Sequence, residues 1–113
     1  MINEKLISTL IGSKLEDNGY IKFANGFLLQ WKSQTVTAGG TAWGNVYYSD
    51  HEMGNWSVNF TKLFVTWSNI ETPQHWCTNA NQTKISAGLI RTFRPNAGTI
   101  STKVNIFGLG MWK

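Results

Sequence analysis

Cysteine, proline and charge are scarce in this chain of 113 residues. The single cysteine, Cys77, excludes an intrachain disulfide and a zinc site built on cysteines. Charged residues make up only 14% of the sequence, and the ten lysines and arginines are scattered along it rather than clustered. A nucleic-acid-binding surface gathers its basic residues. The net charge of +4 therefore does not predict a nucleic-acid partner.

Long hydrophobic runs are missing as well. No run approaches the roughly 20 apolar residues of a transmembrane helix, so no membrane insertion is expected. Residues Met1 to Lys5 lack the cationic start and the apolar stretch of a signal peptide. We expect a single domain, made in the cytoplasm and not exported by the usual route.

Residues 20–32 carry the clearest local pattern. Asn25-Gly26 predicts a hairpin with a two-residue type I′ turn. In that register Ile21 faces Gln30 and Tyr20 faces Trp31. One face then carries Tyr20, Lys22, Ala24, Phe27, Leu29 and Trp31, and the other carries Ile21, Phe23, Leu28 and Gln30. Both faces are mostly apolar, so both need cover, and the second cover is expected from another subunit.

The rest of the chain divides into one helical pattern and several short strands. Apolar residues at spacings of three and four predict a helix over residues 2–15, and Asn18-Gly19 ends it. We therefore assign residues 1–18 to an N-terminal helix and junction, and residues 19–113 to a β-domain. Candidate strands lie at 35–37, 43–48, 56–60, 62–68, 83–93 and 100–112. Gly108 and Gly110 in the last of these predict a bend or a close backbone approach. The predicted fold is all-β, a small antiparallel β-sandwich with a short N-terminal helix.

Two segments resemble a known family. The run from Gly19 to Gly26, followed by Gln30-Trp31, is similar to the opening of the C-terminal head domain of bacteriophage and prophage tail fibres. That opening usually runs Gly-aromatic-aliphatic-Lys-x-Pro-Asn-Gly, then aliphatics, then Gln-Trp. Ala24 stands where the proline is usual, and Lys32 where a glycine is common. The chain also ends like that family, and the resemblance covers about residues 16–32 and 100–113.

The resemblance implies a symmetric homotrimer at the tip of a tail fibre, joined to an upstream shaft and carried on the virion. The implied function is recognition of a bacterial surface receptor, expected to be a glycan, for adsorption to the host. No catalysis and no cofactor are expected. Two alternatives from other classes stay open: a structural trimerisation cap without receptor binding, and a carbohydrate-binding module.

The aromatic residues give the candidate binding site. Trp31 and Trp67 lie on alternating apolar strands and are predicted to be core. Other rings cluster among Gly, Asn, Asp and Thr, a mixture that suits sugars because flat rings stack on C–H faces while amides and carboxylates read hydroxyls. The predicted contact loops are 39–56, 71–82 and 94–98. The predicted receptor-binding residues are Trp43, Tyr47, Tyr48, Asp50, His51, Asn55, Trp56, Trp76 and Arg94.

Catalytic and metal sites have weaker patterns. Asp50 and Glu52 would share a face if they lay on a strand, as a glycosidase requires. His75 and Cys77 would also share a face, but a thiol–imidazole pair needs an orienting third group that the sequence does not identify. His51 with Asp50 or Glu52 is a possible cation site, and in a trimer one histidine per chain could meet on the axis. We predict no metal site.

Overall fold

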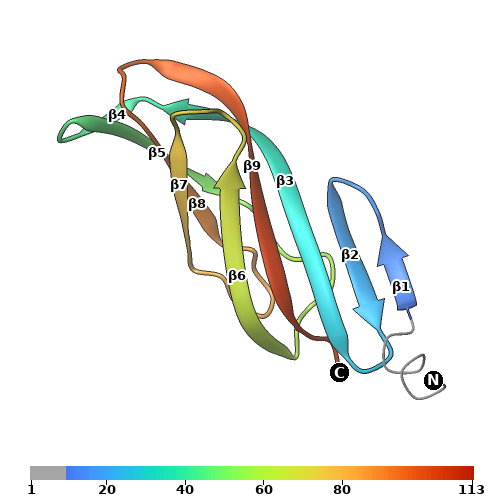
Figure 1. Ribbon diagram of the computed structural model, residues 1–113. Helices are drawn as coiled ribbons and strands as arrows, with labels where there is room; N and C mark the ends of the chain where they lie inside the picture. Colours follow the sequence, from blue (N-terminus) through green and yellow to red (C-terminus); the bar gives the residue numbers. More distant parts are fainter. Residues whose placement is uncertain (1–9) are drawn as a thin grey trace.

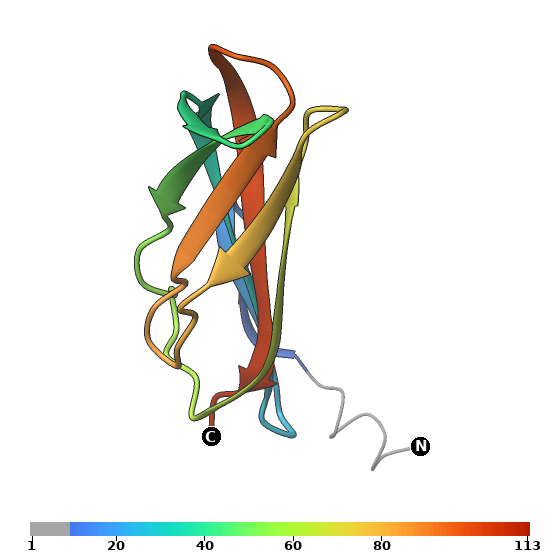
Figure 2. The ribbon, with the colours of Figure 1, turned by 90° about the vertical axis from the view of Figure 1, so that its left-hand side faces the viewer.

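The structure of the protein is a computed structural model that describes residues 10–113. Its nine strands form two antiparallel sheets, one in the order β1-β2-β3-β9-β6 and the other in the order β4-β5-β8-β7. The two sheets lie face to face as layers, with β1 and β2 at one side (Figures 1 and 2). The strands are β1 (Leu10–Lys14), β2 (Asn18–Phe23), β3 (Phe27–Gly39), β4 (Thr41–Trp43), β5 (Val46–Glu52), β6 (Lys62–Ile70), β7 (Trp76–Ala80), β8 (Leu89–Arg94) and β9 (Thr99–Met111).

The predicted all-β, two-sheet antiparallel fold is confirmed, but the N-terminal helix is not seen. Residues 10–14, which were assigned to that helix, form β1 and pair with β2. Gly12 and Ser13 are poor helix formers, and β2 offers them an edge to pair with. Residues 1–9, the rest of the predicted helix, lie outside the described residues. No helix of the described part is long and apolar enough to cross a membrane.

The hairpin of β2 and β3 is present, but its register differs by one residue from the prediction. Tyr20 faces Gln30, and Gly19 faces Trp31. The Gly26 amide donates to the Phe23 carbonyl across a three-residue loop, and only Gly26 has a positive φ there. This is a turn followed by a left-handed glycine rather than a type I′ turn. A shift of one residue exchanges the faces of one strand relative to the other, so Leu28 and Gln30 share a face with Tyr20.

Three other predicted elements changed. Residues 43–48 are not one strand, because Gly44-Asn45 forms a turn that joins the end of β4 to the start of β5. Residues 49–52, which were placed in a contact loop, are instead the end of β5. Residues 56–60 are a loop rather than a strand, and they fill the core. Residues 83–88 are also a loop, so β8 begins only at Leu89.

The core packs directly on the backbone of β9 at two glycines. Gly108 and Gly110 have no side chains on the inward face, so Trp56 and Phe60 lie against the backbone there. A Cβ on Gly108 would come within 3.0 Å of both rings. The two rings meet edge to face with their centroids 5.5 Å apart. The close backbone approach predicted for these two glycines is therefore present, and it makes room for the largest side chain of the core.

A buried amide holds that core loop in place. The side chain of Gln30 is completely buried. Its Nε2 donates to the Val58 carbonyl at 2.6 Å, and its Oε1 accepts from the Val58 amide at 3.1 Å. Gln30 thus satisfies both backbone polar groups of a loop residue that lies in no sheet.

The outward face of the five-stranded sheet has two halves. Toward the chain termini it is apolar, in rows such as Trp31–Phe107–Trp67 and Leu29–Leu109–Val65. Trp67 is 42% exposed and stacks on Phe107 with centroids 5.3 Å apart, so the prediction that it is core was wrong. We call this the apolar half; it comprises Ile21, Phe23, Phe27, Leu29, Trp31, Phe64, Val65, Trp67, Phe107, Leu109 and Met111.

The other half of that face is polar. Ser33, Asn105 and Asn69 lie side by side on β3, β9 and β6. The Asn105 amide donates to Asn69 at 2.7 Å and to the Glu71 carboxylate at 2.8 Å. These side chains satisfy one another, whereas no segment of residues 10–113 packs over the apolar half.

The Gln30 clamp predicts a specific stability difference. We expect Gln30→Ala to lower the free energy of unfolding by about 2–3 kcal/mol, because it leaves the Val58 amide and carbonyl buried without partners. Urea unfolding followed by tryptophan fluorescence measures this. Gln34→Ala, an exposed glutamine on the same strand, is the matched control and should change stability by less than about 0.5 kcal/mol. Equal effects of the two substitutions would contradict the role of Gln30.

Candidate functional site

The outward face of the four-stranded sheet carries a cluster of aromatic rings at the end far from the chain termini (Figure 1). Phe93 on β8 is paired with Tyr48 on one side and with Trp76 on the other. Trp76 stacks on Phe93 with centroids 5.8 Å apart and planes within 10°. Trp43 contacts both Phe93, at 5.9 Å, and Tyr48, at 6.3 Å. We call these four residues the aromatic platform.

The platform exposes its large rings and buries the ring between them. Trp43 is 59% exposed and Trp76 is 44% exposed, whereas Phe93 is only 7% exposed. The indoles therefore present flat surface to solvent, and the buried Phe93 ring between them fixes their positions. Rings held this way offer contact area at low conformational cost.

An ion pair lies beside the platform on the next row of the same face. Arg91 donates through Nε to one oxygen of Asp50 at 2.6 Å and through Nη2 to the other at 2.8 Å. Its guanidinium also lies 4.3 Å from the centre of the Tyr48 ring. The hydrogen bond from Arg91 lowers the pKa of Asp50, and Asp50 in turn raises the pKa of Arg91. Asp50 is therefore a carboxylate at neutral pH, and its charge is matched by its partner.

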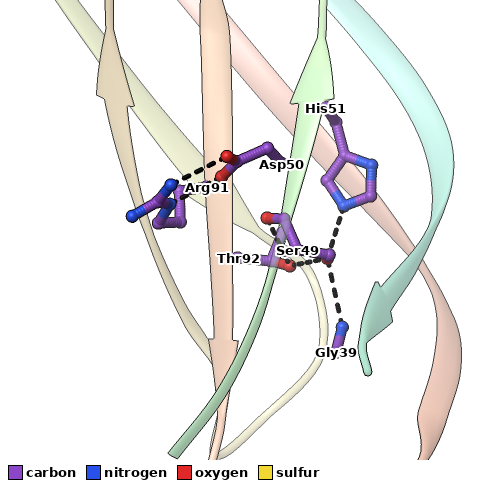
Figure 3. A network of polar contacts seen from close by, with 6 residues as sticks. All are labelled: Gly39, Ser49, Asp50, His51, Arg91 and Thr92. Carbon is purple, nitrogen blue, oxygen red and sulfur yellow. Dashed lines mark hydrogen bonds and ion pairs between the residues drawn. The ribbon is translucent and has the colours of Figure 1, made fainter. Parts of the chain in front are cut away.

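The opposite face of the same strands carries a buried polar network that joins the two sheets (Figure 3). Ser49 Oγ accepts from the Gly39 amide at 3.1 Å, which links β5 to β3. The same oxygen lies 2.7 Å from His51 Nε2 and 2.6 Å from Thr92 Oγ1. Burial lowers the pKa of His51, and the nearby Asp50 charge opposes this only in part.

The structure brings together four of the nine predicted site residues. Trp43, Tyr48, Asp50 and Trp76 all lie on the outward face of the four-stranded sheet. Phe93 and Arg91 complete that surface and were missed. Both lie within the strand predicted over residues 83–93, so the sequence did contain a signal for them.

The other five predicted residues lie elsewhere. Tyr47, His51 and Arg94 are on the inward side of β5 and β8, because neighbouring residues of a strand point to opposite faces. Arg94 packs its stem against Gly39, where a Cβ would come within 2.6 Å of its Cδ. Trp56 is 4% exposed and donates its indole N–H to the Thr83 carbonyl, so it is a core residue rather than a contact residue. Asn55 is exposed at the other end of the sheet.

The catalytic and metal candidates are separated in space. Asp50 and Glu52 share the outward face, but His51 points inward, so the three side chains do not converge. His75 Nδ1 lies 2.9 Å from the Pro73 carbonyl, whereas Cys77 contacts the Ser68 hydroxyl at 3.6 Å. Within residues 10–113, no group of three or more His, Cys, Asp or Glu side chains is placed to hold a metal ion.

No protein-family model and no curated protein matches this sequence. The fold, however, matches that of tail-fibre C-terminal regions. The C-terminal part of the R1 pyocin fibre of P. aeruginosa superposes on 88% of this chain with a TM-score of 0.67 at 10% identity, and the chain spans 27% of its length. An N-truncated R1-type pyocin tail fibre gives 0.65 at 11% identity over 88% of this chain and 84% of its own. The R2-type fibre gives 0.59 at 12%, over 88% and 36%.

The TM-scores show a shared fold, and at these low identities the likeness is one of fold alone. The chain thus has the architecture of the C-terminal region of pyocin tail fibres, which agrees with the resemblance found in its opening and closing segments. That resemblance rests on two terminal segments, whereas the structural match covers 88% of the chain.

His51 predicts how stability depends on pH. Its ordinary pKa is 6.5 and burial lowers this value in the folded protein. The unfolded chain therefore binds a proton first as the pH falls below about 6.5, and the free energy of unfolding decreases until the folded pKa is passed. The pKa of Asp50 is lowered from 3.8 in the folded protein, so Asp50 adds a second loss of stability only below about pH 3.8. We expect the melting temperature to fall between about pH 7 and pH 5.

Replacing the imidazole should remove the first of these losses. His51→Gln keeps a polar group near Ser49 and should flatten the melting temperature over that interval. The matched control is His75→Gln, which leaves His51 in place and should retain the fall. A fall of the same size in His51→Gln would show that another group is responsible.

Proposed function

We propose that this chain is the C-terminal receptor-binding domain of a tail fibre, and that it adsorbs to a glycan on a bacterial surface without chemical turnover. The fold shared with pyocin tail fibres supports the tail-fibre role and a place on a virion or a related particle. The observation that carries the glycan assignment is the aromatic platform with the Asp50–Arg91 pair beside it.

The platform has the chemistry that sugar rings require. A pyranose ring has apolar C–H faces, which stack on exposed indoles such as Trp43 and Trp76. Its hydroxyls are both donors and acceptors, and they suit a carboxylate and a guanidinium held in fixed positions. Asp50 and Arg91 already orient each other, so they lose little freedom on binding.

The proposed absence of turnover follows from the same geometry. A general acid needs a carboxyl group with a raised pKa, but Arg91 lowers the pKa of Asp50. Glu52 lies on the same face as Asp50, but Arg91 holds Asp50 as a carboxylate, so the two do not form an acid–base pair. Incubation with host polysaccharide should therefore produce no new reducing ends.

We further propose that three copies of the chain assemble through the apolar half. This surface includes Phe64 at 48% exposure, Val65 at 47% and Trp67 at 42%. An apolar sheet face of this extent needs cover from protein, and three is the number of copies that the tail-fibre resemblance implies. The aromatic platform lies on the opposite sheet, so assembly leaves it open to a receptor. A preceding shaft would join at the end where Leu10 pairs with Phe23.

Two exposed tryptophans test these two surfaces separately. Trp76→Ala should weaken binding of a soluble oligosaccharide of the host surface about tenfold, because it removes the stacking ring. Trp67→Ala, at nearly equal exposure on the other sheet, is the matched control and should leave that affinity unchanged. Calorimetry with a monovalent oligosaccharide, chosen by a bacterial glycan array, keeps avidity out of the comparison. Equal affinities for wild type and Trp76→Ala would contradict the platform assignment.

The assembly proposal is tested by mass in solution. Val65→Lys places a charge at the centre of the apolar half and should convert a trimer into a monomer, because an unpaired charge cannot be buried there. Light scattering measures the change. Thr37→Lys, on the polar half of the same sheet face, is the control and should leave the mass unchanged. A wild-type monomer would overturn the assembly proposal.

The two experiments together also separate receptor binding from the alternative of a purely structural cap. A cap requires the apolar half but makes no use of exposed indoles on the other sheet. A trimer that binds no glycan on the array would favour the cap.

A further inference from the structure

A small recess lies at the other end of the outward face that carries the aromatic platform. It encloses about 220 Å³, which is roughly the volume of seven waters. Its walls come from the end of β5, from residues 54–55 and from the loop between β7 and β8. The lining residues that matter here are Glu52, Asn55, Asn81, Ser86 and Leu89.

The recess is continuous with the platform along one face of the sheet. Glu52 pairs with Leu89, two residues beyond the Asp50–Arg91 pair on the same strands. Since side chains alternate along a strand, Tyr48, Asp50 and Glu52 all point outward. Glu52 in the recess lies four residues along β5 from Tyr48 in the platform, a distance of about 13 Å. A short oligosaccharide lying along β5 would reach both.

The walls of the recess are fixed by internal hydrogen bonds. The Met53 amide donates to the Gly88 carbonyl, and the Ala87 amide donates to the Gly54 carbonyl, both at 2.8 Å. The two N–H groups of the Gln82 side chain are shared among three carbonyls of the surrounding loop, those of Ala80, Ala87 and Leu89, at 2.8, 3.1 and 3.3 Å. Lys32 Nζ holds the Asn55 carbonyl at 2.8 Å.

The polar side chains that face the recess are not used by these bonds. Among residues 10–113, the side chains of Glu52, Asn55 and Asn81 have no hydrogen-bond or ion-pair partner. Asn81 is held at φ 64°, a left-handed conformation that is uncommon for a residue other than glycine. One carboxylate and two amides are therefore available at a rigid site.

We propose that this recess is a second subsite of the glycan surface and that it binds one neutral sugar unit. This inference rests on the proposed function, since it takes the platform as the neighbouring subsite. The carboxylate and amides accept and donate hydrogen bonds to ring hydroxyls, and the volume suits a single ring. Among the residues that the structure describes, Glu52 is the one charged side chain that lines the recess, and it disfavours an anionic sugar, while Lys32 is engaged by the Asn55 carbonyl in the wall.

The test uses the full chain and nuclear magnetic resonance, with a panel of D-glucose, D-galactose, D-mannose, L-rhamnose and N-acetyl-D-glucosamine as probes. We expect one neutral sugar to shift the side-chain amide of Asn81 and the backbone amides of Gly54 and Gly88 in a saturable way. The tryptophan indole N–H signals report on the platform in the same spectra.

Three variants establish which side chains are responsible. Asn81→Gly removes the amide without backbone strain, because glycine accepts a positive φ, and should weaken binding about tenfold. Glu52→Gln keeps the shape and should weaken binding of the neutral sugar while admitting D-glucuronate, which the wild type rejects. Asn59→Ala, an exposed asparagine outside the recess, is the matched control and should have no effect.

The possible outcomes separate this inference from the proposed function. Shifts confined to the indole signals would overturn the recess while leaving the platform in place. Shifts at neither site, even at high millimolar sugar, would overturn both. Saturable shifts at Asn81 with CaCl2 but with no sugar, or tighter binding of D-glucuronate than of every neutral sugar, would overturn the assignment to a neutral sugar.

Discussion

The fold depends on one buried amide. Gln30 lies on the central hairpin, and its side chain takes up both backbone groups of Val58. Residues 53–61 belong to no sheet, yet they supply Trp56 and Phe60 to the core. A loop in the interior requires a partner for every backbone polar group, and an apolar residue in place of Gln30 supplies none. The bare backbone at Gly108 and Gly110 is the matching requirement, because it provides the space into which the two rings settle.

This arrangement explains why the glutamine and the tryptophan that follow the hairpin turn occur together. Gln30 points inward to hold the core loop, and Trp31 points outward. The Trp31 ring lies over Gly19, where a Cβ would come within 2.6 Å of it, and its indole N–H donates to the Glu16 carbonyl. Gln30 thus joins the hairpin to the core loop. Trp31, packed on Gly19, joins it to the connection between β1 and β2.

The sequence was informative where a local pattern determines a local structure. The hairpin, the two-sheet antiparallel fold and the close approach at Gly108 and Gly110 could all be predicted. The hairpin register could not, since Asn25-Gly26 fits both a two-residue and a three-residue loop, and only the inward position of Gln30 decides between them. Residues 10–14 have helical spacing but form a strand, because the edge of β2 was open to pairing.

The candidate site was predicted in part for a similar reason. Trp43, Tyr48, Asp50 and Trp76 share a surface only because three pairings align β4, β5, β8 and β7, and a single sequence does not reveal those pairings. Trp56 and Trp67 show the limit most clearly. Each was placed by the polarity of its neighbours in sequence, yet Trp56 fills the core through a loop and Trp67 lies exposed on the outward face of a sheet.

The separation of the two outward faces has a consequence for variation. The apolar half and the aromatic platform belong to different sheets and share no side chain, so they are connected only through the core between them. Replacing a ring on β4 or β7 leaves the apolar half chemically as it was. Under the proposed function, such a domain would change its receptor by single substitutions while the proposed assembly is retained.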